Sequence, residues 1–461
     1  MPDRIASRRD PIIDADGHTI EFLPAVRDDL RTLAGGRAVA ELDAVLGFAQ
    51  TARALCPEQR RAYNLPRLSW WGLPTENTLD RATAMLPRLL HSRLDELGID
   101  FAVCYPTYGL FALGIRNPEA RQAACRAFNR HLAHEFADLA GRMTPAALIP
   151  METPDEARSE LDHAVTQLGL KAVVLAGHAW RPLAPDAPPG ARWVDAFGPD
   201  SPYDYDPVWR RCAELKVAPT FHSSSMSWHG RASLRSYVSN HIGSFAAAGE
   251  ATCRSLFLAG VPHRFPTLRF AFLEGGAAWA CALFAGLVGH WEKRNRSEIG
   301  RYDPARLDRA LLGRLFAQHG AGKTPSDDAL ACLSDPDEDR AALDEFAASG
   351  IEGPEDLVRL FADRFFFGCE ADDRFAAVAA DPRWHPLGAR LRPIFGSDIG
   401  HWDVPDATRV AAEARELVER GLFDADGFRD FTFRNAVRLW AGVDPDFFAG
   451  TRVEAAARDI R

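Results

Sequence analysis

The residues with the clearest chemical potential stand near the start of the chain, in the run Pro11-Ile-Ile-Asp-Ala-Asp-Gly-His18. Side chains alternate between the two faces of a β-strand, so Asp14, Asp16 and His18 are expected on one face of this segment. Carboxylates and an imidazole on one side of a buried strand favour a site for a divalent metal. The structural alternative is that Asp16-Gly17 makes a turn, or that an acid here caps a following helix.

Later apolar runs end in the same kinds of residue. Three of them carry His222, Glu274 and Asp398 at or near their carboxyl ends. The carboxyl ends of parallel strands meet at one face of a sheet or barrel, so we expect these side chains to converge with those of the first run. With three polar neighbours added, the candidate metal ligands are Asp16, His18, Glu21, His222, His241, Glu274, Asp398 and His401.

The elements that must position these residues are eight short apolar runs separated by helical patterns, which predict an α/β fold with a parallel sheet. They lie at 11–18, 97–106, 143–150, 170–177, 217–222, 268–276, 364–370 and 393–398. Eight such units predict a (β/α)8 TIM barrel with helical insertions. A doubly wound open sheet is the competitor, although it would gather its ligands at a single switch point.

We expect one metal-dependent barrel domain over residues 1–461. Helical patterns predict insertions at about 24–95 and 277–363, which could act as lids or dimer contacts, and a helical tail from about residue 407. Residues 181–205 are rich in Pro, Gly and Asp and are expected to be irregular.

The amino-acid composition is that of a globular protein and argues against several kinds of partner. Hydrophobic residues make up 47% and charged residues 26% of the chain, the balance of a globular protein with a sizeable core. A net charge of −10 argues against nucleic acid or an anionic membrane as partner. No signal peptide or membrane span is evident, and eight scattered cysteines without a Cys-x-x-Cys pair suit reduced thiols, so a cytoplasmic location is expected.

As a set, these strand-end motifs resemble those of the amidohydrolase superfamily, specifically the branch of aminocarboxymuconate-semialdehyde decarboxylase and the resorcylate-type decarboxylases. The motifs are Asp16-Gly-His18, Phe221-His222, Leu273-Glu-Gly-Gly276 and Gly396-Ser-Asp398-Ile-Gly-His401-Trp-Asp. The resemblance covers most of the chain and implies a divalent metal held by Asp16, His18, His222 and Asp398. It also implies that Asp398 acts as the catalytic base.

The sixth run departs from that family, because Glu274 stands where the family typically has a histidine. A carboxylate there makes the site harder and favours iron or manganese over zinc. Four carboxylates and four histidines exceed the needs of one ion, whereas two divalent ions would be neutralised by the four acids. This combination also resembles a group of TIM-barrel non-haem diiron monooxygenases typified by a hydroxylase of platensimycin and platencin biosynthesis.

The second resemblance implies two iron ions, O2 as co-substrate, and hydroxylation of an unactivated carbon in a small molecule, with Asp398 and His222 in the catalytic centre. Relatives of that group act largely on coenzyme A-linked substrates, which implies an acyl-coenzyme A substrate and an external electron donor. The alternatives are a hydrolase or decarboxylase with one zinc or manganese ion, and a non-catalytic binding barrel. We expect a homo-oligomer, as a dimer.

Other polar residues near strand ends have structural interpretations. Asp14 is expected to support the ligands from behind. Glu370 and Asp372 follow the seventh run and are interpreted as loop acids rather than ligands. His178 is interpreted as a structural histidine, and Lys171 stands at the wrong end of its strand to bridge two metals.

Overall fold

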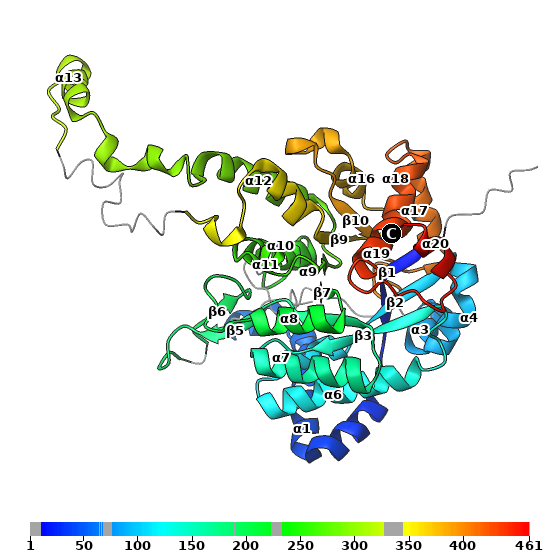
Figure 1. Cartoon of the computed structure of the whole chain (residues 1–461). Helices are drawn as coiled ribbons and strands as arrows, with labels where there is room; N and C mark the ends of the chain where they lie inside the picture. The colour runs from blue at the N-terminus through cyan, green and yellow to red at the C-terminus, as the bar shows by residue number, and fades with distance from the viewer. Residues whose placement is uncertain are drawn as a thin grey trace, which may run out of the picture.

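Eight parallel strands form the centre of the molecule and are surrounded by helices (Figure 1). The computed structural model describes residues 11–63, 65, 67, 76–188, 190–222, 233–326 and 344–460. The strand order is β1-β2-β3-β4-β7-β8-β9-β10, so each strand neighbours the next one of the barrel along the chain. This arrangement confirms the predicted TIM barrel. The strands are β1 (Ile13–Thr19), β2 (Phe101–Pro106), β3 (Met143–Ile149), β4 (Ala172–Ala176), β7 (Pro219–His222), β8 (Phe270–Phe272), β9 (Phe365–Cys369) and β10 (Arg392–Phe395).

The first and last strands meet through the residues that follow β10. The Asp398 N–H donates to the Asp16 carbonyl oxygen at 3.0 Å. The Ser397 N–H donates to Asp14 Oδ1 at 2.9 Å, and the Ser397 hydroxyl donates to Asp14 Oδ2 at 2.5 Å. Two predicted metal ligands therefore lie on the seam that closes the barrel.

Side chains of the strands alternate between two buried layers, as expected for a barrel covered by helices. On β2, Val103 and Tyr105 belong to one hydrophobic cluster and Ala102 and Cys104 to the other. In β1 a register shift between Asp14 and Gly17 interrupts this alternation. The prediction that Asp14 shares a face with Asp16 and His18 was therefore wrong. Asp14 pairs with Ala102, and the bulge that follows adds one residue to β1, so that the later side chains point to the opposite face.

Helices separate and follow the strands. They are α1 (Leu23–Ala54), α2 (Pro57–Ala62), α3 (Thr78–Met85), α4 (Pro87–Leu97), α5 (Gly109–Ala112), α6 (Pro118–Glu135), α7 (Pro154–Leu161), α8 (Asp206–Leu215), α9 (Tyr237–His241), α10 (Ser244–Leu258), α11 (Val261–Arg264), α12 (Ala278–Arg294), α13 (Arg309–His319), α15 (Pro354–Leu357), α16 (Phe375–Ala380), α17 (Val410–Glu419), α18 (Ala425–Arg429), α19 (Asn435–Trp440) and α20 (Glu454–Arg458). None of those described is both long and apolar enough to cross a bilayer.

The described parts of both predicted insertions contain helices, and so does the tail. Helices α1 to α4 lie between β1 and β2, and α12 and α13 follow β8. Figure 1 shows α13 at the end of an extension that leads away from the barrel, and α13 has no buried residue.

The expectation of irregular structure over residues 181–205 was wrong in part. Strand β5 (Ala179–Pro182) pairs antiparallel with β6 (Arg192–Asp195), and the two form a separate two-stranded sheet after β4. The strand pattern is weak in this segment, because it is rich in Pro and Gly and few of its residues are β-branched or aromatic.

Candidate metal centre

Two buried histidines from opposite sides of the strand order face one another across the barrel. His18 comes from β1 and His222 from the last position of β7. Their Nε2 atoms are 3.0 Å apart, and the side chains are 0% and 2% exposed. The His18 Nδ1 atom lies 3.4 Å from the Thr107 hydroxyl, which orients the ring from behind.

Carboxylates surround this pair of nitrogens. Asp16 Oδ1 lies 3.7 Å from His18 Nε2 and 3.6 Å from His222 Nε2. Glu274 Oε2 lies 3.0 Å from His222 Nε2. Within the described chain, the ion pairs of these two acids are with histidines alone.

Asp398 joins the cluster from the carboxyl end of β10, together with His401. Asp398 Oδ1 lies 3.4 Å from His18 Nε2 and 2.5 Å from His401 Nδ1. The His401 ring lies 4.0 Å from the His18 ring between centroids, and its Nε2 is 3.4 Å from the Thr107 hydroxyl. A single threonine of the β2 loop therefore contacts both imidazoles.

The structure brings six of the eight predicted ligands together in two groups that share His18. One atom from each of Asp16, His18 and His222 lies within 4.8 Å of the others, and the same holds for His18, Glu274, Asp398 and His401. Mixed nitrogen and oxygen donors at these separations fit a divalent ion such as zinc, manganese or iron.

The electrostatics of the cluster favour a cation. Burial raises the pKa of Asp16, Glu274 and Asp398 well above the ordinary value, and neighbouring acids add to the rise. Burial also lowers the pKa of the histidines, for His401 to about 3. The imidazoles are therefore neutral electron-pair donors near neutral pH, and the acids lack a charge partner that a metal would provide.

Two of these acids occupy strained backbone positions. Glu274 has a φ of 57° and Asp398 a φ of 48°, in the left-handed region that residues with a Cβ rarely adopt. Such conformations cost about 1–3 kcal/mol each and persist where the surrounding structure fixes them, which is commonly at functional sites. The strain turns both carboxylates toward the cluster at the ends of β8 and β10.

Glu21 is not among the residues that the described structure gathers. Its carboxylate accepts hydrogen bonds from three successive N–H groups of the β2 loop, those of Thr107 at 3.2 Å, Tyr108 at 2.8 Å and Gly109 at 2.9 Å. Burial raises the pKa of Glu21 to about 7. The side chain therefore holds the loop that carries Thr107.

His241 also lies outside both groups. It ends α9 and packs among rings that we call the aromatic wall: Tyr237, His241, Phe245 and Trp402. The wall adjoins the metal cluster, because the Phe245 ring lies 6.1 Å from the His222 ring. His241 thus lines the apolar surroundings of the cluster.

The sequence analysis did not identify three residues of the centre as site residues. Thr107 belongs to no motif, and its contacts with His18 and His401 depend on how the β2 loop packs. Glu370 was interpreted as a loop acid, yet it lies with Asp398 and Asp403 in a third group whose ligand atoms are within 4.8 Å. Their positions in the sequence could have indicated a role in the site, because Glu370 directly follows β9 and Asp403 is five residues past Asp398.

Among solved structures, the chain is similar to an amidohydrolase from Mycobacterium avium subsp. paratuberculosis K-10, with a TM-score of 0.51, 21% identity, and coverage of 79% of this chain and 77% of that one. It is also similar to a protein described as amidohydrolase II, with a TM-score of 0.52, 11% identity, and coverage of 93% and 99%. At these identities the likeness concerns the fold.

A curated protein, the decarboxylase orsB of Emericella nidulans, is 29% identical over 156 residues, or 32% of this chain. The match spans 42% of that relative, less than half of its length. The model of the amidohydrolase family matches residues 13–442, which include all eight barrel strands and every residue of the metal cluster. The chain therefore belongs to the amidohydrolase family.

Proposed function

We propose that this protein is a metal-dependent decarboxylase that acts on a small carboxylic acid with an apolar or aromatic body. The observation that carries the proposal is the pair of His18 and His222 Nε2 atoms, 3.0 Å apart with buried carboxylates on both sides. The curated relative is named as a decarboxylase, and membership of the amidohydrolase family supports a metal-dependent reaction at the strand ends of the barrel. A hydrolase with the same metal is the nearest variant of this proposal.

Asp16, His18, His222 and Asp398 would hold the metal. When bound, a divalent cation such as manganese or zinc supplies positive charge that attracts and orients the carboxylate of the substrate. The aromatic wall offers an apolar surface next to His222, against which a ring can lie and from which water is excluded.

Asp398 and His401 are placed to hold a proton. Their side chains approach to 2.5 Å, and both are almost completely buried. In decarboxylation the bond between the carboxylate carbon and the body of the substrate breaks, CO2 leaves, and the electron pair stays on the substrate carbon. That carbon then takes a proton, which the Asp398–His401 pair would supply.

The test is a product assay on protein stripped of metal and reloaded with one metal at a time. We expect CO2 release from phenolic or other aromatic carboxylates with manganese or zinc, without O2 consumption. The Asp398→Asn variant should bind the substrate but release no CO2. Turnover that requires O2 and a reductant would contradict the proposal.

The surplus of ligands favours a second candidate, oxygen-dependent hydroxylation with two iron ions. Glu274, Asp398 and His401 form a group with His18 in addition to the group of Asp16, His18 and His222. Metal analysis of protein expressed without added metal, with Mössbauer spectroscopy on iron-57 material, separates the two candidates. Two irons per chain that O2 oxidises would support hydroxylation, and zinc or manganese in place of iron would support decarboxylation.

A further inference from the structure

The loops that follow β9 and β10 place three carboxylates together beside the histidine-bearing groups. Glu370 directly follows β9, and Asp398 and Asp403 both follow β10. One carboxylate oxygen of each lies within 4.8 Å of the others. The two strands are neighbours in parallel register, with Phe395 opposite Cys369, so their carboxyl ends bring these loops side by side.

Two buried oxygens of this cluster, one on Asp398 and one on Asp403, lack a hydrogen-bond donor among the described residues. The Asp398 side chain is 4% exposed, and its Oδ2 atom has no donor among the described residues, whereas Oδ1 faces His18 and His401. Asp403 Oδ1 is likewise buried without a donor. No lysine or arginine of the described chain forms an ion pair with Glu370, Asp398 or Asp403.

Buried carboxylates without donors repel one another unless a proton or a cation lies between them. The two nearest imidazoles, His18 and His401, approach Oδ1 of Asp398. Among the described residues, no positively charged side chain therefore lies between the three carboxylates.

We propose that Glu370, Asp398 and Asp403 form a separate cation site, which binds a hard divalent ion such as Mg2+ or Mn2+ through oxygen ligands. It contains no histidine and is thus distinct from the centre used in the proposed function, with which it shares Asp398. Oxygen-only sites select magnesium, calcium and manganese over zinc. An ion here would tie the β9 and β10 loops together and fix the second oxygen of Asp398.

The test is a titration of metal-free, full-length protein with Mn2+, in which the electron paramagnetic resonance signal of free Mn2+ gives the number of ions bound per chain. The double variant Glu370→Gln with Asp403→Asn should bind one ion fewer than the unaltered chain. The matched control is Asp372→Asn, which removes a nearby exposed acid and should bind the same number as the unaltered chain. Excess Mg2+ should displace the ion that the double variant lacks.

His222→Ala separates this proposal from the proposed function. Equal Mn2+ binding by the double variant and the unaltered chain overturns the oxygen-only site, and the proposed function stands if His222→Ala loses an ion. An ion lost by the double variant and retained by His222→Ala supports the oxygen-only site and counts against the histidine-bearing centre. If the double variant does not fold, as judged by circular dichroism, Asp403→Asn alone decides between the same outcomes, because Asp403 is only partly buried.

Discussion

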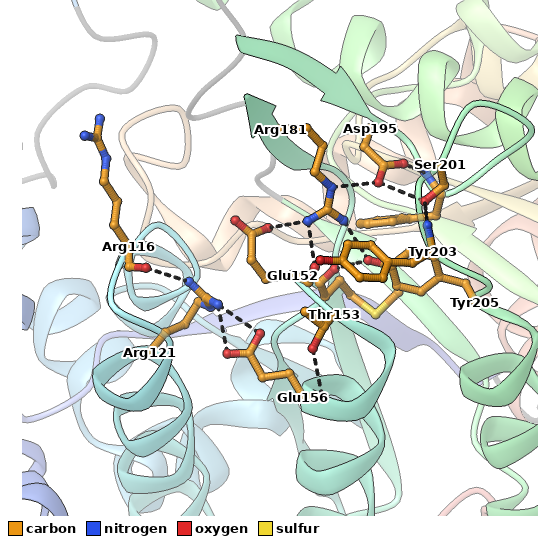
Figure 2. A network of polar contacts seen from close by, with 12 residues as sticks. Arg116, Arg121, Glu152, Thr153, Glu156, Arg181, Asp195, Ser201, Tyr203 and Tyr205 are labelled. Atoms are coloured by element: carbon orange, nitrogen blue, oxygen red, sulfur yellow. Dashed lines mark hydrogen bonds and ion pairs between the residues drawn. The ribbon is translucent and has the colours of Figure 1, made fainter. Parts of the chain in front are cut away.

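The molecule holds two clusters of buried charge, and they differ in what neutralises their acids. In the network shown in Figure 2, each acid has an arginine. Glu156 accepts two hydrogen bonds from the Arg121 guanidinium, at 2.9 and 3.0 Å, and Arg181 donates to Asp195 at 2.9 Å. Among the described residues, the neighbours of the acids in the metal cluster are neutral imidazoles and other acids.

The comparison separates structural acids from functional ones. Arg181 also donates to the Glu152 carbonyl oxygen and the Tyr205 hydroxyl, so the network fastens the β5–β6 hairpin to the loop after β3 (Figure 2). A buried acid that pairs with an arginine has its charge neutralised by the protein itself. A buried acid without an arginine is neutralised only when a cation or a proton binds, and this difference can be tested in several ways.

The largest effect is expected for Asp398→Asn. Loss of a proton-holding ligand should lower kcat/KM by about 10⁴-fold, or about 5 kcal/mol. The same change should raise the free energy of unfolding of the metal-free protein, because an amide is easier to bury than a carboxylate among acids and asparagine tolerates a positive φ. Steady-state kinetics and chemical denaturation measure the two quantities, and a marked loss of metal-free stability would show that Asp398 is structural.

Glu156→Ala should instead lower the free energy of unfolding. It leaves Arg121 buried without its partner, which costs about 3–5 kcal/mol of unfolding free energy. The control is Asp155→Ala, because the neighbouring Asp155 side chain is 95% exposed and its loss should change stability by less than about 0.5 kcal/mol. Urea denaturation of both variants checks this. If they are equally stable, the arginine network does not stabilise the fold.

Metal removal should destabilise the protein without disturbing the arginine network. At a free metal concentration 100 times the Kd, binding stabilises the folded state by about 2.7 kcal/mol. The melting temperature should therefore fall on chelation and recover when manganese or zinc is restored. His222→Ala should respond less to chelation than the unaltered chain, because it lacks one histidine of the metal cluster, while Glu156→Ala should respond as fully as the unaltered chain.

The smallest effect concerns Glu21, whose carboxylate forms no ion pair with a described residue and accepts hydrogen bonds from three N–H groups. Burial raises the pKa of Glu21 in the folded protein to about 7, above that of the unfolded chain. The folded state therefore holds a proton that the unfolded state has lost, and stability falls as pH rises from about 5 to 8, by about 2 kcal/mol. Glu21→Gln should flatten this slope in metal-free protein, and an unchanged slope would assign it to other groups.

The barrel and most of its site follow from sequence because strand periodicity and strand ends are local signals. His18, His222, Glu274 and Asp398 each stand at the end of an apolar run, and a closed barrel brings such ends together. Glu21 and His241 have suitable chemistry near the right strands, but their contacts depend on loop conformation. Proximity in sequence did not distinguish a ligand from a residue that holds a loop.

Other features depend on geometry that a single sequence does not encode locally. The bulge in β1 turns Asp14 away from the alternation that its spacing predicts. Glu370 and Asp403 belong to different loops, and only the pairing of β9 with β10 brings them together. The β5–β6 hairpin is held by Arg181, whose partners come from three segments of the chain.

The seam between β1 and β10 determines when during synthesis this centre can form. Ser397 and Asp14 are 383 positions apart, and a ribosome that adds about 5–20 residues per second needs roughly 20 to 80 s to travel that distance. Throughout that interval the first-strand ligands lack their partners from the last strand. The nascent chain consequently cannot assemble the complete ligand set until the ribosome has passed His401.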